Sequence, residues 1–186
     1  MNIISCSYFI GDNNIPNTSY DDVKSIVDNL IAVYEDKYLE RMIGYELLVK
    51  VKDANSAVPP AEPEQKFKDL LNGVEFIGLD GIKKKWLGFK NTETFESPIA
   101  DFVFWFYLKR NATQTTGVGE ATASMQNAMN ASSKQKMVDA HNRMVDKNKI
   151  LHELLTVKYL DYPEYQYRPS GIENRSMLVK LNPYGI

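Results

Sequence analysis

Apolar residues recur at steps of three and four in two long stretches of the chain, and this spacing predicts two amphipathic helices. Thr18 or Ser19 can cap the first helix. Its first turn carries Asp21 and Asp22, where the helix dipole favours negative charge. The periodic apolar positions of this helix are Val23, Ile26, Val27, Leu30, Ile31, Tyr34, Tyr38, Leu39, Met42 and Ile43.

The second periodic stretch begins at Lys134 and ends near Tyr162, just before a proline. Its stripe consists of Met137, Val138, His141, Met144, Val145, Asn148, Leu151, Leu155 and Tyr159. The spacing predicts a second long helix that buries this stripe.

Residues 97–110 lie between these helices and are apolar on every side beyond Asp101, until Lys109 and Arg110. Ser97 can cap a helix here, and Pro98 suits its first position. A helix without a polar face must be surrounded by protein or lipid. Because a membrane span needs about 20 apolar residues, this shorter run predicts the central helix of a soluble helical domain.

Shorter elements follow from turn residues. Gly44 interrupts the first helix, and residues 45–52 continue it as a second, bent piece. A short helix over residues 64–71 ends at Asn72-Gly73. Residues 74–89 read as a β-hairpin because two alternating runs flank an Asp-Gly turn.

The predicted fold class is mainly α, a helical bundle around the central aromatic helix, with the hairpin and extended arms at both ends. The arms comprise residues 1–17 and 161–186, and the helical domain comprises residues 18–160. Within the domain, residues 111–133 are predicted as a loop, because Glu120 is the sole charged residue there and little can be buried. In the C-terminal arm, residues 177–181 form a short apolar run of strand type.

Composition narrows the classes of function. The net charge of −2 gives no global attraction to nucleic acid or to an acidic membrane. Cys6 is the single cysteine, which excludes an internal disulfide framework. The N-terminus lacks the pattern of a secretory signal, so a reducing cytoplasm is the expected compartment.

No catalytic constellation is visible, so the chain is not expected to be an enzyme or to hold a cofactor or metal. His141 and His152 would stand about three helical turns, roughly 16 Å, apart, too far to share a metal ion. Cys6 has no basic neighbour that would activate its thiol. The segment Gly117-Val118-Gly119 lacks the lysine and third glycine of a phosphate loop.

A basic run, Lys83-Lys84-Lys85-Trp86, leaves a second function open. On a strand, Lys83 and Lys85 point to one face while Lys84 and Trp86 point to the other. The three lysines are possible DNA contacts, because stacking combined with phosphate pairing is the usual basis of nucleic-acid binding. A solvated hairpin edge protected by lysines is the structural alternative. A small enzyme or ligand carrier is a third hypothesis, and no convergent polar set favours it.

Several segments together resemble one protein family. They are residues 15–17 (Ile-Pro-Asn), 38–47, 70–76, 85–89, the aromatic helix from Pro98, 115–119 and the closing Asn-Pro-Tyr-Gly-Ile at 182–186. The chain resembles the head-to-tail connector proteins, adaptors or ring proteins, of bacteriophages that infect Bacteroidetes, including crAss-like phages.

The resemblance implies a structural virion protein of the phage neck, assembled in the host cytoplasm. Copies would form a ring, dodecameric by the resemblance, between the portal protein and other connector or tail rings. DNA would pass through the ring without sequence specificity, and no membrane would be involved. The implied assembly residues are Thr115, Thr116, Val118, Met125, Met177, Leu178, Val179, Leu181, Tyr184 and Ile186.

Overall fold

The structure, a computed structural model, describes residues 1–56, 64–112, 114–116, 119–121, 133–167 and 176–182. Its α-helices are α1 (Asp21–Ile43), α2 (Tyr45–Ala54), α3 (Gln65–Asn72), α4 (Pro98–Ala112) and α5 (Ser133–Val157). Its strands are β1 (Val74–Ile77), β2 (Lys83–Trp86), β3 (Gln114–Thr116) and β4 (Gly119–Ala121). Short 3-10 helices span Cys6–Tyr8, Gly11–Asn13 and Pro163–Tyr167. The predicted mainly α fold with a β-hairpin is confirmed.

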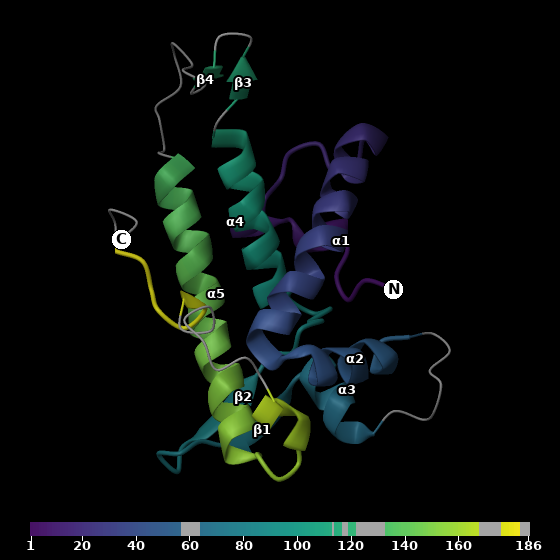
Figure 1. Ribbon diagram of the computed structural model, residues 1–186, viewed down its shortest axis with the longest axis vertical. Coiled ribbons are helices and arrows are strands. Elements are labelled where there is room, and N and C mark those ends of the chain that lie inside the picture. Colours follow the sequence, from purple (N-terminus) through teal and green to yellow (C-terminus); the bar gives the residue numbers. More distant parts are fainter. Residues whose placement is uncertain (57–63, 113, 117–118, 122–132, 168–175, 183–186) are drawn as a thin grey trace.

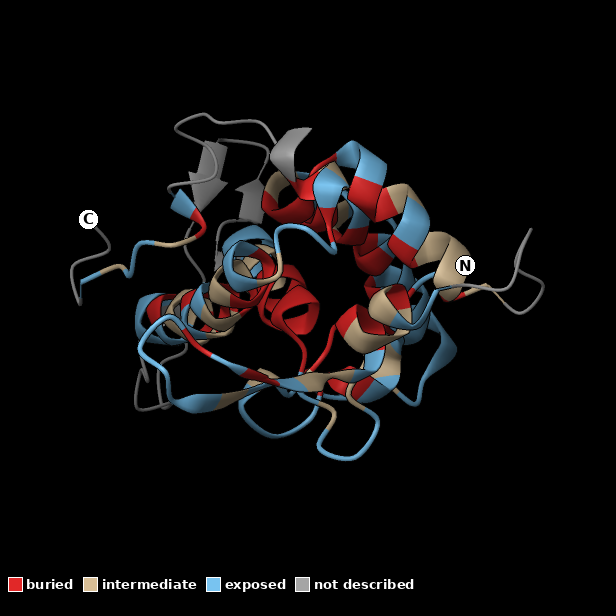
Figure 2. Cartoon of the chain, turned by 90° about the horizontal axis from the view of Figure 1, so that it is seen from below, coloured by how far each residue is buried: buried red, intermediate tan, exposed pale blue. Residues whose placement is uncertain are grey.

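The two helices α4 and α5 lie side by side, and α1 packs on α4 (Figure 1). At one end of this group lie α2, α3 and the β1–β2 hairpin, and at the other end β3 and β4 extend beyond the helices (Figure 1). Buried residues face the interior between the helices, and exposed residues cover the outside (Figure 2).

The central helix α4 starts as its sequence predicts. The backbone N–H of Ile99 donates to Ser97 Oγ at 3.1 Å, so Ser97 caps the helix and Pro98 takes its first position. The first part of the helix, through Phe104, is fully buried. Farther along, Phe106 stacks on Tyr34 of α1 with ring centroids 4.0 Å apart. The aromatic run therefore forms the contact surface between helices.

Two details of α1 differ from the predictions. The helix starts at Asp21 with Tyr20 at the N-cap and no side-chain capping bond, so the prediction of a Thr18 or Ser19 cap was wrong. Ile26, predicted on the buried stripe, is 49% exposed, because the packed elements cover the side of α1 that carries Val27. Tyr159, counted on the second stripe, lies beyond the end of α5 and is also exposed.

The end of α3 and the end of β2 approach very closely, and this contact positions the hairpin. Gly73 and Gly88 both have positive φ angles, +100° and +92°. A Cβ on Gly73 would lie 2.6 Å from the Trp86 carbonyl oxygen, and one on Gly88 would collide with the Leu71 carbonyl oxygen. Only glycine fits both positions, because backbone fills the space on either side.

The N-terminal arm is not extended. It forms two 3-10 turns and packs into the core of its own chain, where its large apolar side chains are buried. Those residues are Ile3, Ile4, Tyr8, Phe9 and Ile15. The reason is hydrophobic: a free arm would leave all five side chains in water.

The segment 111–133, predicted as a loop, contains the end of α4 and the paired strands β3 and β4. The run 177–181, predicted to be of strand type, forms no strand: residues 177–178 lie in a turn, residue 179 in a bend, and residues 180–181 are irregular. Its main chain is bonded to side chains of α5 rather than to a strand.

Candidate assembly surfaces

The described tail, residues 176–182, lies against α5 of the same chain. Asn142 makes two bonds to Leu181, since its Oδ1 accepts from the backbone N–H at 2.8 Å and its Nδ2 donates to the carbonyl at 3.0 Å. Asn148 Nδ2 donates to the Met177 carbonyl at 2.8 Å, and His141 Nε2 lies 3.1 Å from the Val179 carbonyl. Polar side chains of α5 therefore satisfy backbone groups of the tail that, in a β-sheet, the main chain of a neighbouring strand would satisfy.

Asn148 also links the tail to α1. It is fully buried, and its Oδ1 accepts a short hydrogen bond from the hydroxyl of Tyr38. Burial, with a contribution from the nearby Asp101 carboxylate, raises the pKa of Tyr38, so the hydroxyl stays protonated and remains a donor. In the sequence, Asn148 stands out as a polar residue on the apolar stripe of α5. The sequence does not indicate which groups it contacts.

Beneath the tail lies an apolar groove of about 390 Å³ between α4 and α5. Its lining includes Phe102, Trp105, His141, Met144 and Met177. Burial lowers the pKa of His141, although its hydrogen bond to the Val179 carbonyl acts in the opposite direction. The predicted interior or interface role of His141 therefore corresponds to a contact between α5 and the tail.

The predicted assembly residues have different environments. Met177 is 2% exposed, Val179 is 60% exposed, and Leu178 and Leu181 are half-buried. Thr115 and Thr116 belong to β3, opposite Glu120 and Gly119 of β4. The remaining four, Val118, Met125, Tyr184 and Ile186, lie outside the described residues.

The β3–β4 hairpin stands beyond the ends of α4 and α5, away from the core (Figure 1). Its three residue pairs run from Gln114↔Ala121 to Thr116↔Gly119. A two-stranded hairpin is marginally stable in water on its own. A surface that covers it would therefore stabilise it.

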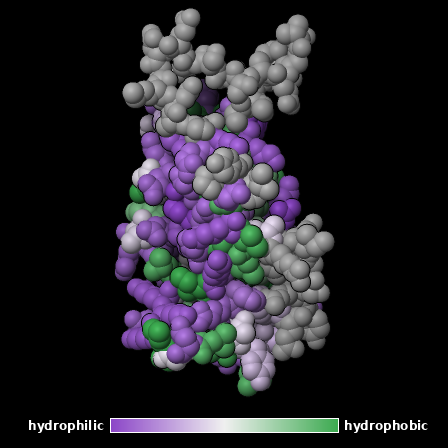
Figure 3. Space-filling view, turned by 90° about the vertical axis from the view of Figure 1, so that its left-hand side faces the viewer, coloured by the Kyte–Doolittle hydropathy of each residue, from purple (hydrophilic) through white to green (hydrophobic). Residues whose placement is uncertain are grey.

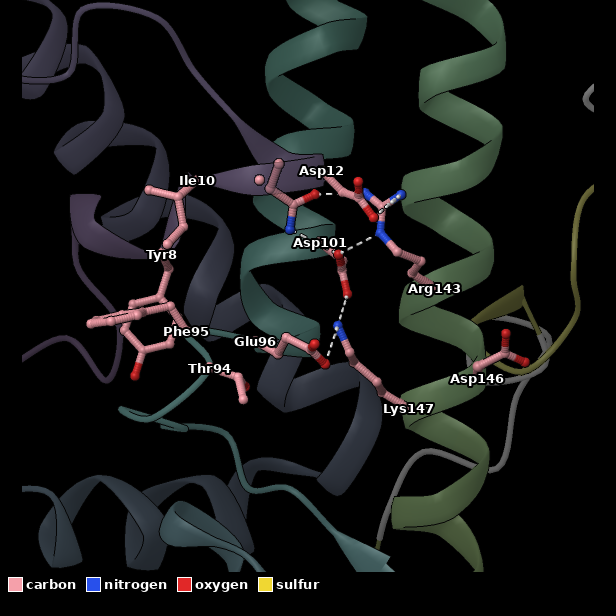
Figure 4. Close-up of a pocket in the computed structure, with 12 residues that line it drawn as sticks. Tyr8, Ile10, Asp12, Thr94, Phe95, Glu96, Asp101, Arg143, Asp146 and Lys147 are labelled. Atoms are coloured by element: carbon pink, nitrogen blue, oxygen red, sulfur yellow. Dashed lines mark hydrogen bonds and ion pairs between the residues drawn. The ribbon is translucent and has the colours of Figure 1, made fainter.

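A charged cleft of about 410 Å³ lies between the N-terminal arm, α4 and α5 (Figure 4). At its base the fully buried carboxylate of Asp101 accepts from Lys147 Nζ at 2.7 Å and from Arg143 Nε at 3.3 Å. Asn13 Nδ2 donates to the same carboxylate at 2.8 Å, and Arg143 Nη2 donates to Asn13 Oδ1 at 2.7 Å.

This network ties the N-terminal arm to both helices. A buried carboxylate needs partners for its charge and its lone pairs, and two cations and an amide supply them here. Sequence reasoning noted Asp101 as the polar residue of an apolar run and missed its partners. The signal was present on α5, where Arg143 and Lys147 stand four residues apart and so share a helix face.

The basic run of β2 divides as predicted between two faces. Lys83 and Lys85 are exposed, and Lys83 pairs with Glu75 across the hairpin at 2.5 Å. Lys84 is held by Glu153 at 2.7 Å and by Asp80 at 2.9 Å. Trp86 is 1% exposed and its Nε1 donates to the Leu70 carbonyl, so its ring is not available to stack on a base. Lys83 and Lys85 keep exposed side chains, and a phosphate at Lys83 would have to compete with Glu75.

The remaining candidate groups have structural contacts. Burial, together with a hydrogen bond to Asp28, raises the pKa of the Cys6 thiol to about 12. His152 Nδ1 lies 2.7 Å from the hydroxyl of Tyr165. Among the described residues, no cluster of three or more His, Cys, Asp or Glu side chains is placed to hold a metal ion. No helix in the same part of the chain is long and apolar enough to cross a bilayer.

Compared with known proteins, the chain matches no family model, no curated protein and no solved structure.

Proposed function

We propose that this chain is a structural subunit of a bacteriophage head-to-tail connector. Copies form a ring in the virion neck, next to the portal protein and other connector or tail rings, and DNA passes through the ring without sequence specificity. The dodecameric copy number and the assembly in the host cytoplasm follow from the resemblance alone. The proposal includes no catalysis, cofactor, metal or membrane.

The observation that carries the proposal is the β3–β4 hairpin at the far end of the α4–α5 pair (Figure 1). The hairpin stands apart from the helical core, and the flanking sequence over 111–133 is polar and nearly uncharged. An element of this kind gains order and stability when a neighbour covers it. In a ring, each copy can supply that cover to the next.

The tail supports a more limited role than the resemblance implies. Met177 is buried against its own chain and the tail's main chain is bonded to α5, so the described tail offers a neighbour mainly the exposed side chains of Val179 and Lys180. Arms that lie on their own subunit before assembly keep the isolated chain compact. Assembly through Met177 would require the tail to leave α5 first.

The test is the mass of the purified protein, alone and mixed with the portal protein of the same phage, together with negative-stain images. We expect ring-shaped particles of uniform mass that appear or increase with the portal. A protein that remains a single copy at high concentration and in the presence of the portal would overturn the proposal.

The alternative, a nucleic-acid-binding module, has one specific observation in its favour, the exposed pair Lys83 and Lys85 on one face of β2. A filter-binding assay at several salt concentrations separates the two functions. The module requires an affinity that falls steeply with salt and falls further in the Lys83→Ala/Lys85→Ala variant. A connector requires neither.

A further inference from the structure

The groove beneath the tail has the size and the lining of a small-molecule site. Its volume is about 390 Å³, and ligand pockets in proteins span roughly 300–1,000 Å³ with mostly apolar and aromatic linings. Two aromatic rings of α4, Phe102 and Trp105, line it together with Met144 of α5 and Met177 of the tail. Methionine side chains are flexible and adapt to ligands of different shape. The groove therefore suits an apolar molecule.

This apolar lining is a local feature of its side of the molecule. Figure 3 looks onto the side on which α5 and the described tail lie in Figure 1, and it shows a largely hydrophilic surface with apolar surface in separate patches. The groove is thus not the edge of a broad apolar face.

The charge of the lining is positive. It contains two cations, Arg41 of α1 and Lys180 of the tail, and no acidic side chain of the described residues. Lys180 already pairs with Asp146 at 2.7 Å. Arg41 is half-buried and forms no ion pair with any acid in the described part of the chain. Arg41 therefore gives the groove a positive charge that the described residues do not neutralise.

The remaining titratable group of the lining leaves this charge unchanged. His141 donates from Nε2 to the Val179 carbonyl, since a carbonyl can only accept, and burial favours the neutral imidazole by lowering its pKa. A further cation stands at the aromatic wall, where Lys109 Nζ lies 5.4 Å from the centre of the Trp105 ring. The electrostatic surroundings of the groove thus favour an anion.

We propose that the groove binds a small apolar molecule that carries one carboxylate, of the class of a medium-chain fatty acid. Its apolar body packs against Phe102 and Trp105, and its carboxylate pairs with Arg41, whose planar guanidinium can donate two parallel N–H bonds. Because Met177 and Leu181 of the tail also line the groove, the bound molecule fastens the tail to α5. This site goes beyond the proposed ring function and does not depend on it.

Two ligands that differ in their charge test the role of Arg41. Decanoate and 1-decanol are titrated separately into the full-length protein in a calorimeter, below the concentration at which decanoate forms micelles. We expect one decanoate to bind per chain. Arg41→Gln should weaken decanoate binding by about tenfold, because a charge-assisted hydrogen bond is lost, and should leave 1-decanol binding within about twofold.

The matched control is Lys24→Gln, which removes an exposed cation of the same helix, about 25 Å along its axis from Arg41. It should change neither affinity. An equal loss of both ligands in Arg41→Gln, an unchanged decanoate affinity in that variant, or no decanoate binding at millimolar concentration to the unmodified protein would each overturn the inference.

Two further measurements locate the ligand. Decanoate should change the tryptophan fluorescence, and Trp105→Phe, which keeps an aromatic wall, should abolish the change, because Trp86 is 1% exposed and lies outside the groove lining. Decanoate should also slow amide hydrogen exchange in residues 176–182. A fluorescence change that persists in Trp105→Phe, or exchange that stays the same, would place the ligand elsewhere and contradict the proposed site.

A competing occupant is a second copy of the chain. If neither ligand binds and the protein instead associates with itself through contacts that Trp105→Ala weakens, the groove is a subunit interface and the inference is wrong. The outcome for the connector function is separate. Rings without decanoate binding leave that function standing, and a single-copy protein that binds decanoate leaves the ligand site standing.

Discussion

At the N-terminus, residues 1–15 bury five large apolar side chains in the core, whereas at the C-terminus residues 176–182 bury Met177 and leave Val179 60% exposed. The polar contacts also differ in direction. The arm's backbone N–H groups at Ile3 and Ile4 donate to a buried carboxylate, Glu35 of α1. The tail is bound mainly by amide and imidazole side chains of α5 that contact its carbonyl groups.

The difference suggests different roles for the two ends. The N-terminal arm is part of the folded core, because removing it would open the space between α1 and α4 and expose Asp101 and Glu35. The tail is attached through the buried side chain of Met177 and a few hydrogen bonds at the edge of a groove. If one end exchanges between copies during assembly, the tail can do so at the smaller free-energy cost.

The largest effect is expected in the N-terminal arm. Phe9→Ala removes a ring that is 1% exposed and should lower the free energy of unfolding by about 3–5 kcal/mol. Val179→Ala, the matched truncation in the tail, should change it by less than about 0.5 kcal/mol, because the side chain is already largely in water. Chemical denaturation measures both values. Equal losses would remove the distinction between the two ends.

The next largest effect is expected at Glu35. The Glu35→Ala change leaves the buried N–H groups of Ile3 and Ile4 without an acceptor and should destabilise the fold by about 2–3 kcal/mol. Glu35→Gln keeps one acceptor oxygen and should lose about half as much. Hydrogen exchange of the two amides, read beside denaturation, should speed up strongly in the alanine variant. Unchanged exchange there would show that apolar packing alone holds the arm.

In the tail, Asn142→Ala removes both bonds to Leu181 and should lower stability by about 1 kcal/mol, because these groups are partly exposed and can bond to water instead. The loss should appear locally, as faster proteolysis or exchange in residues 176–182, with little change in the global transition. Lys149→Ala, an exposed α5 change outside the tail contact, is the control. A global loss as large as that of Phe9→Ala would place the tail in the core.

The smallest effect concerns pH and His141. Burial holds its pKa below the ordinary 6.5, so the unfolded chain binds the proton more readily than the folded one. The stability linked to this group is therefore complete above about pH 6.5 and declines as the pH falls through the lower, folded-state value. His141→Gln should flatten this part of the denaturation profile between about pH 8 and pH 5. Identical profiles for both proteins would contradict it.

The helices and the first hairpin could be predicted because their signals are local. Ser97 and Pro98 start α4, Gly44 interrupts the helix that precedes it, and Asp80-Gly81 turns the first hairpin, and each acts over a few residues. The division of the lysines between two faces of β2 follows from the strand period alone.

The contacts that bind the two ends could not be predicted, because they join residues far apart in the chain. Nothing near Glu35 indicates that its carboxylate receives the N–H groups of Ile3 and Ile4, and nothing near residue 181 indicates an amide on α5. Apolar residues at a terminus indicate only that their side chains need to be covered. Whether the cover is the chain's own core or a neighbour depends on the shape of the folded surface.

The sequence by itself determined where the long helices and the β1–β2 hairpin form, because spacing and turn residues act locally, whereas β3 and β4 were not predicted. The tertiary structure alone decided which of the chain's apolar residues are covered. It buried the N-terminal arm, placed Asp101 between two cations, and left Ile26, Val33 and Leu79 exposed. The physical reason is that burial depends on how whole elements pack, so a side chain's exposure is settled only when its distant neighbours are in place.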